Sequence, residues 1–178
     1  MGVRRAVDEA KRTYGEGVYI LGEIIHNESV ISEIAALGTK TVDSPEEIPG
    51  GTVIIRSHGV GRDVYDKLRD KGVKIIDCTC PFVLKIHKIV EKYHSLGYKI
   101  VITGEKTHPE VVGINGWCDN SAVVLDEEYE SADFSEAEKI CLVSQTTYST
   151  ERFKKILEFF SKKTVKTLEV FETICYTT

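Results

Sequence analysis

The sequence lacks the features that would place a protein in a membrane or on nucleic acid. No stretch approaches the roughly 18 uninterrupted apolar residues of a membrane span, and the first residues carry no apolar signal region. Basic residues are not in excess, because 23 Lys and Arg stand against 28 Asp and Glu, which gives a net charge of −5. We therefore expect a cytoplasmic globular protein with no membrane and no nucleic-acid partner.

The sequence also lacks the pattern of a disulfide-stabilised secreted domain. It contains five cysteines, an odd number, in 178 residues. In a cytosolic chain such cysteines are more often free thiols, cluster ligands or small buried apolar groups than disulfides. A metal centre or a structural role is therefore expected for each thiol.

An internal duplication organises the chain. The segment Val18–Glu28, which carries His26, lines up with Ile100–Glu110, which carries His108, at a constant offset of 82 (108 − 26). Repeats of this length are whole α/β units, since solenoid modules repeat every 20 to 50 residues or so. Two similar units are therefore predicted.

The offset grows along the repeat. Residues 54–59 match residues 142–147 at an offset of 88 (142 − 54), and the strand ending at Cys80 matches the strand ending at Cys175 at an offset of 95 (175 − 80). Loop insertions explain the growth. The position that matches Cys80 in the first unit lies just before residue 1, and three residues follow Cys175, so we expect a fragment of a longer protein.

Helical and strand periodicities alternate along both repeats. Short continuous apolar strands separated by helices predict parallel sheets that helices cover on both faces. We therefore predict an α/β fold of pseudo-repeated units, with a first repeat at 1–79, a second at 80–174 and the start of a third at 175–178. The expected helices lie near 3–14, 30–35, 64–68, 82–93 and 153–160, and the strands near 18–21, 53–55, 73–76, 100–102, 122–125 and 140–143.

Three histidines follow predicted strands at equivalent places. In open parallel sheets the binding crevice lies beyond the carboxyl ends of the strands, where His26, His58 and His108 are expected. Imidazoles near helix N-termini favour an anion of the phosphate class. His87 and His94 instead fall inside a helical pattern and are interpreted as ordinary helix-surface or boundary residues.

Glu110 follows His108 closely in the same loop. A carboxylate beside phosphate is electrostatically unfavourable, so Glu110 is interpreted as a proton donor or relay. The alternative is an ordinary acidic residue in the first turn of a helix, where Asp and Glu are common. This choice stays open from the residues alone.

Cys80 and Cys175 each lie at the junction of a strand with the next unit. With a third equivalent cysteine, three thiolates suit an iron–sulfur cluster in which one iron has no protein ligand. A zinc site or inert buried cysteines are the alternatives. The other thiols have no repeat partner and are expected to be structural; they are Cys78, Cys118 and Cys141.

Several segments together resemble one family. They are Gly2–Val7, Ile25–Asn27, Arg56–Val60, Asp77–Pro81, His108–Gly113, Ser144–Thr147 and Thr173–Cys175. In this order and spacing they resemble the LytB/IspH family of 4-hydroxy-3-methylbut-2-enyl diphosphate reductases from end to end of the chain.

The resemblance implies a trefoil of three α/β units around a [4Fe-4S] cluster, of which this chain supplies two units. The family reduces an allylic alcohol diphosphate to isopentenyl and dimethylallyl diphosphate, the last step of non-mevalonate isoprenoid biosynthesis, with electrons from a ferredoxin or flavodoxin. By position, Cys80 and Cys175 match cluster ligands, and His26, His58 and His108 match diphosphate-binding residues. Glu110 matches the proton-delivering acid, with His108 near the substrate hydroxyl, and Thr146 matches the hydroxyl that orients the acid.

The chain departs from the family pattern in two respects, and two other functions remain as alternatives. The first cluster cysteine and the third unit are missing, so the 178 residues alone are expected to bind the cluster poorly and to be inactive. A non-redox phosphate-binding module would explain the histidines, although Gly-x-Gly-x-x-Gly and Walker sequences are absent. A zinc or thiol interaction protein would explain Cys78, Cys80 and Cys175.

Overall fold

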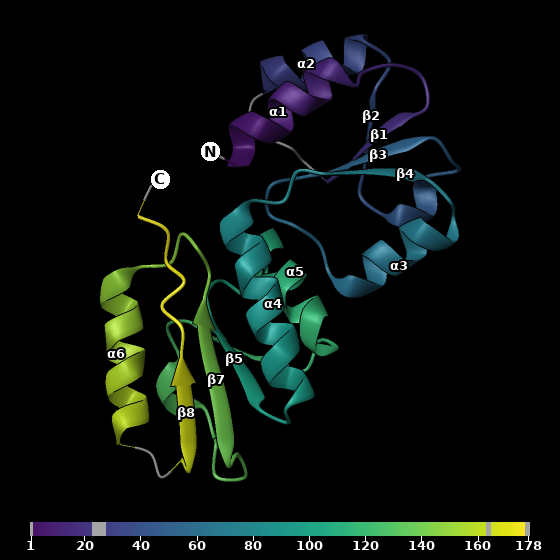
Figure 1. Cartoon of the computed structure of the whole chain (residues 1–178). Helices are drawn as coiled ribbons and strands as arrows, with labels where there is room; N and C mark the ends of the chain where they lie inside the picture. Colours follow the sequence, from purple (N-terminus) through teal and green to yellow (C-terminus); the bar gives the residue numbers. More distant parts are fainter. Residues whose placement is uncertain (1, 23–27, 163–164, 177–178) are drawn as a thin grey trace. The chain divides into compact units, whose positions relative to one another are not determined.

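The computed structural model describes residues 2–22, 28–162 and 165–176. The chain divides into two compact units, Met1–Pro81 and Phe82–Thr178. Each unit is an α/β layer structure with one four-stranded parallel sheet, which confirms the predicted fold class (Figure 1). None of the helices in the described ranges is long and apolar enough to cross a membrane.

The first unit has a sheet in the order β2-β1-β3-β4, with every neighbouring pair parallel. Its central strands are continuous apolar runs because helices cover both faces. Its elements are α1 (Gly2–Arg12), β1 (Val18–Leu21), α2 (Glu28–Ala36), β2 (Lys40–Val42), the 3₁₀ turn η1 (Pro45–Glu47), β3 (Thr52–Ile55), α3 (Arg62–Asp70) and β4 (Lys74–Asp77).

Small side chains let α1 approach this sheet closely. Ala6 and Ala10 are fully buried and pack with Ile20 and Ile54, and Cys78 belongs to the same cluster. Figure 1 shows α1 and α2 on one side of the sheet and α3 on the other. The strand β2 was not predicted, since only Val42 of its three residues is buried and the apolar signal of an edge strand this short is weak.

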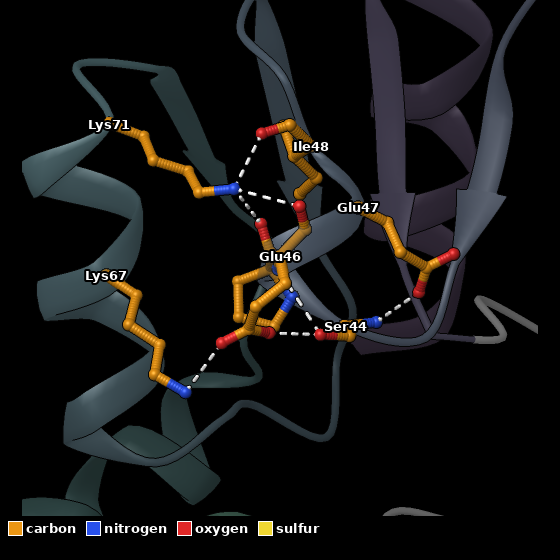
Figure 2. A network of polar contacts seen from close by, with 7 residues as sticks. Ser44, Glu46, Glu47, Ile48, Lys67 and Lys71 are labelled. Atoms are coloured by element: carbon orange, nitrogen blue, oxygen red, sulfur yellow. Dashed lines mark hydrogen bonds and ion pairs between the residues drawn. The ribbon is translucent and has the colours of Figure 1, made fainter.

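A lysine ties the end of α3 to the connection between β2 and β3. The connection contains η1, where Ser44 and Glu47 form a reciprocal capping box. Lys71 Nζ donates to three backbone carbonyls at 2.7 to 3.1 Å, those of Pro45, Ile48 and Glu46 (Figure 2). A single ammonium therefore binds three carbonyls of the short turn, of which that of Pro45 also accepts from Ile48 N–H at 3.3 Å.

The second unit repeats the same topology, with strand order β6-β5-β7-β8 and all pairs parallel. Its elements are α4 (Pro81–Ser95), β5 (Lys99–Thr103), α5 (Pro109–Asn115), η2 (Gly116–Cys118), β6 (Val123–Leu125), η3 (Tyr129–Ser131), β7 (Lys139–Ser144), α6 (Thr150–Ser161) and β8 (Thr167–Val170).

Alternate residues of the central strands supply two cores, one on each face of this sheet. Ile100 and Val143 pack under α4 and α5, whereas Val101 and Leu142 pack under α6 through residues such as Phe153. Figure 1 shows the sheet between α4 and α6. This two-sided burial rigidly fixes the strand ends, where the loops with candidate site residues begin.

Candidate active site

The loop after β5 lies directly beside the loop after β7. Thr103 pairs with Ser144 in the sheet, and Gln145 N–H donates to Thr103 O at 2.8 Å. Gly104 follows Thr103, and a Cβ there would lie 2.8 Å from a Val111 side-chain carbon and 2.9 Å from the Gln145 side chain. Only glycine therefore allows the loops to approach this closely.

His108 begins helix α5 and acts as its N-cap. Its Nδ1 accepts a hydrogen bond from Glu110 N–H at 3.1 Å, and Pro109 occupies the first helical position. Because Nδ1 is the acceptor, the proton of a neutral ring lies on Nε2. The cap thus fixes the tautomer of His108 and, through the helix start, the direction of the Glu110 side chain.

Glu110 is a buried carboxyl group held by one residue. It is 2% exposed, Oε1 accepts from Thr146 N–H at 2.6 Å, and Oε2 accepts from the Thr146 hydroxyl at 2.7 Å. Burial raises the pKa of Glu110, and the two hydrogen bonds from Thr146 oppose that rise only in part. A carboxyl group of this kind can carry a proton closer to neutral pH than an exposed one.

Thr146 also connects Glu110 to the segment that carries Cys175. Cys175 N–H donates to Thr146 O at 2.7 Å. Two residues earlier, the Thr173 hydroxyl donates to Ser144 O at 2.6 Å and accepts from Ser144 N–H at 2.8 Å. The sequence-predicted residues of the second unit, His108, Glu110, Thr146 and Cys175, therefore form one hydrogen-bonded series.

The first unit carries the equivalent loop and thiol. His58 follows β3 and is half-buried, and Cys80 N–H donates to Ser57 O at 2.9 Å. Gly22 again ends the first strand, and a Cβ there would lie 2.3 Å from Arg56 Nη1. Both units thus bring a polar side chain against a glycine. His26 lies outside the described residues.

The structure corrects the alignment of the two repeats by one residue. Leu21 pairs with Ile55, and its equivalent Thr103 pairs with Ser144, so the offset at this strand is 89 (144 − 55) and not 88. The bonds Cys80 N–H to Ser57 O and Cys175 N–H to Thr146 O agree with 89. Ser57, rather than His58, is therefore the counterpart of Thr146. Hydrogen-bond register decides this, because apolar letters align equally well after a one-residue slip.

The five cysteines fall into two environments, and all are free thiols. Cys80 and Cys175 are half-buried and lie beyond the strands rather than at the predicted strand ends, since β4 ends at Asp77 and β8 at Val170. Burial raises the pKa of the other three thiols and disfavours the metal-binding thiolate; they are Cys78, Cys118 and Cys141. Among the described residues no group of three possible ligands forms a metal site, while the exposure and thiolate chemistry of Cys80 and Cys175 fit cluster ligation individually.

His87 differs from the expectation of a helix-surface or boundary residue. It is 2% exposed and stacks on Trp117, with ring centroids 5.1 Å apart and an interplanar angle of 21°. It contributes to the packing of α4 against η2. The burial comes from a residue 30 positions away, which helical periodicity does not report. His94 is partly exposed and lies 3.1 Å from Asp119 Oδ2.

A cavity of about 780 Å³ opens at the amino ends of β5 and β7, next to Lys99 and Lys139. None of the sequence-predicted site residues lines it. We place the candidate active site beyond the carboxyl ends of the strands instead, because the buried Glu110, the helix-capping His108 and the half-buried Cys175 lie there.

Thr146→Val tests the support of the buried acid. The substitution removes the hydroxyl that donates to Glu110 Oε2, so we expect the pKa of Glu110 to rise further and the free energy of unfolding at pH 7 to fall by about 1 to 3 kcal/mol. Urea unfolding and NMR titration of Glu110 measure both effects. Thr107→Val is the control, because it removes a hydroxyl that donates to the exposed carboxylate of Glu105 at 3.2 Å, and Thr146→Ser is expected to restore the parent values. Equal pKa values in Thr146→Val and the parent would contradict this account.

The raised pKa of Glu110 also predicts how stability depends on pH. A carboxyl group whose pKa is higher in the folded chain binds its proton more tightly there. Its contribution to folding stability is therefore complete below the pKa of the unfolded state and is lost as pH rises through the pKa of the folded state. We expect the free energy of unfolding of the parent to fall relative to Glu110→Gln as pH rises from about 4.3. Urea unfolding from pH 4 to 8 measures the difference, with Glu105→Gln at an exposed carboxyl as control. A difference that grows in favour of the parent with rising pH would disprove the assignment.

Comparisons of the sequence and of the structure with known proteins indicate the same family. The family model described as LytB protein matches residues 1–178. The chain is 45% identical over 181 residues to the 4-hydroxy-3-methylbut-2-enyl diphosphate reductase of Thermoanaerobacter sp. (strain X514), covering 98% of this chain and 62% of the relative. It is 42% identical to the enzyme of the same name from Clostridioides difficile (strain 630), covering 99% of this chain and 65% of the relative.

Two solved structures share the fold. A structure of (E)-4-hydroxy-3-methyl-but-2-enyl diphosphate reductase, described as the terminal enzyme of the non-mevalonate pathway, matches with a TM-score of 0.82 and 37% identity over 98% of this chain and 64% of the solved chain. The E-1-hydroxy-2-methyl-but-2-enyl-4-diphosphate reductase from Plasmodium falciparum matches with a TM-score of 0.85 and 25% identity over 98% and 57%. The chain thus spans 57 to 65% of the length of these four relatives, and it belongs to the LytB protein family.

Proposed function

We propose that this chain is part of an iron–sulfur reductase that converts 4-hydroxy-3-methylbut-2-enyl diphosphate to isopentenyl and dimethylallyl diphosphate. One observation on this chain's own residues carries the proposal. The buried carboxyl group of Glu110 accepts two hydrogen bonds from Thr146, and the carbonyl of Thr146 accepts one from Cys175 N–H. A proton source and a thiol ligand therefore share one rigid support. Family membership supplies the substrate class.

The reaction removes a hydroxyl group and adds hydrogen in its place. The allylic C–O bond breaks, two electrons and two protons enter, a C–H bond forms and water leaves. Glu110 in its protonated form delivers a proton to the leaving oxygen, because a departing hydroxide is too basic to leave without one. Burial favours that protonated form. Thr146 holds the carboxyl group in one orientation.

The histidines serve the substrate. His108, with its tautomer set by the helix cap, presents Nε2–H as a donor for the diphosphate or the substrate hydroxyl. His26 and His58 are assigned to the diphosphate. Binding of the diphosphate holds the reacting carbon in place. The translational and rotational entropy of the substrate is therefore lost on binding and not in the chemical step.

Cys80 and Cys175 would hold a [4Fe-4S] cluster together with a third cysteine. When bound, the cluster supplies electrons singly and acts as a Lewis acid toward oxygen. A ferredoxin or flavodoxin is the proposed electron donor. The five free thiols fit a reducing compartment, so we keep the cytoplasm as the proposed location.

The two competing functions use fewer of the observed features. A non-redox phosphate-binding module has no use for a buried protonatable acid beside the anion, since a carboxylate there opposes phosphate. A zinc or thiol interaction protein leaves Glu110 and the His108 cap without a role. The reductase uses the acid, the cap and the thiols together.

The test uses the product of the complete coding sequence that contains these residues. After anaerobic reconstitution with iron and sulfide, it is supplied with a chemical one-electron donor and the allylic diphosphate. We expect a brown protein with absorption near 400 nm and release of both isoprenyl diphosphates. A colourless protein that binds zinc, or a cluster protein without turnover, would refute the proposal. The 178 residues alone are expected to hold little cluster and to be inactive.

A further inference from the structure

A side-chain turn carries Cys80 away from the edge strand of the first unit. β4 ends at Asp77, and Asp77 Oδ1 accepts from Thr79 N–H at 2.9 Å and from the Thr79 hydroxyl at 2.5 Å. This is an Asx-turn, in which a carboxylate replaces a backbone carbonyl and bends the chain. Cys80 is the first residue after it.

The carboxylate of this turn is itself fixed from a neighbouring helix. Tyr65 on α3 is 7% exposed, and its hydroxyl donates to Asp77 Oδ2 at 2.9 Å and lies 3.4 Å from Thr79 Oγ1. Arg5 on α1 donates to the Asp77 carbonyl at 3.2 Å. The phenol is protonated and can donate at neutral pH, and burial raises the pKa of Tyr65 further above its ordinary value. Side chains from two helices, α1 and α3, therefore donate hydrogen bonds to the first residue of this turn.

Backbone bonds on both sides complete the support. Cys78, which is 1% exposed in the core, donates its N–H to Ile55 O at 3.0 Å, and the half-buried Cys80 donates its N–H to Ser57 O at 2.9 Å. The turn thus lies between a buried cysteine and a half-buried one. The second unit holds the Cys175 segment differently, through the Thr173 hydroxyl, which accepts from Ser144 N–H and donates to Ser144 O.

We propose that Asp77 is a positioning residue for the Cys80 thiol, acting through Thr79 and held by Tyr65. The use of that thiol as a cluster ligand rests on the proposed function, whereas the positioning itself is a property of the ligand-free chain. Removal of the Asp77 carboxylate should release the Cys80 segment from the turn. The core of the first unit should stay intact, because α1 and α2 still bury Cys78.

The test measures iodoacetamide alkylation of each cysteine in the ligand-free 178-residue chain by mass spectrometry. In Asp77→Ala we expect Cys80 to react about tenfold faster, because the carboxylate that accepts from Thr79 N–H, the Thr79 hydroxyl and the Tyr65 hydroxyl is lost. Cys175 should react at the parent rate. Cys78 should remain protected, which shows that the first unit is still folded.

Three further variants separate the effect of the turn from other causes. Asp77→Asn can still accept from Thr79 N–H, so its Cys80 rate should stay near that of the parent; a rise equal to that of Asp77→Ala would mean that lost charge is the cause and would overturn the proposal. Tyr65→Phe keeps the ring in the core and should give a smaller rise than Asp77→Ala. Asp126→Ala is the matched control, because Asp126 also accepts from a tyrosine, Tyr148, at 3.0 Å in the other unit. It should leave the Cys80 rate unchanged.

Two further results would overturn the positioning role. One is an unchanged Cys80 rate in both Asp77→Ala and Tyr65→Phe. The other is a parallel rise at Cys78, which would mean that the unit simply unfolds; Tyr65→Phe, a milder change, decides this if Asp77→Ala does not fold. Failure of the reductase assay with a positive alkylation result would reject the proposed function and leave the positioning role standing.

Discussion

Glu110→Gln is expected to lower the turnover number of the reconstituted complete enzyme by a factor of about 100 or more, the range of general acid catalysis. Gln can keep both contacts with Thr146, since its amide oxygen accepts from the N–H and its amide nitrogen donates to the hydroxyl oxygen. The substitution thus removes the proton and little else. Substrate affinity and cluster absorption should be close to those of the parent.

Steady-state kinetics with a chemical reductant measures the loss of turnover. Glu105→Gln is the matched control, because Glu105 lies in the same loop, is exposed and accepts only from the Thr107 hydroxyl among the bonds described for its side chain. It should leave turnover within about twofold of the parent, as expected for a surface substitution. Full activity in Glu110→Gln would remove Glu110 from the mechanism and return it to the role of a helix N-terminal acid.

Cys80→Ser and Cys175→Ser are each expected to abolish stable cluster binding in the complete protein. A hydroxyl is a poorer ligand for iron than a thiolate, and loss of a direct ligand should exceed the roughly 10- to 100-fold loss of affinity that outer-shell substitutions cause. Iron and sulfide content and absorption near 400 nm measure the effect after reconstitution.

The buried cysteines provide the control for this loss. Cys141→Ala removes a thiol that is fully buried in the core below α4 and α5 and whose burial raises its pKa to about 12. It should lower stability through a small cavity and leave the iron content of the folded protein unchanged. Equal iron loss in Cys141→Ala and Cys175→Ser would contradict the division of the thiols into two environments.

Much of the architecture could be predicted from periodicity. Apolar runs bounded by glycines identified the central strands, and the duplication implied two similar sheets. The edge strand β2 was missed because its signal consists of one buried valine. Asp77 could have been found from its spacing to Thr79, since an Asp two residues before a hydroxyl residue is typical of an Asx-turn.

The sequence alone determined the alternation of helices and strands, the repeat, the family and the identity of the groups at the strand ends, because these depend on residue type and spacing. Tertiary structure decided what those groups can do. Thr146 reaches Glu110 across 36 positions only because β5 and β7 pair in one register, and the shift in the pKa of Glu110 exists only once packing removes water. Register and burial are properties of neighbours that are distant in the chain, so local sequence patterns do not report them.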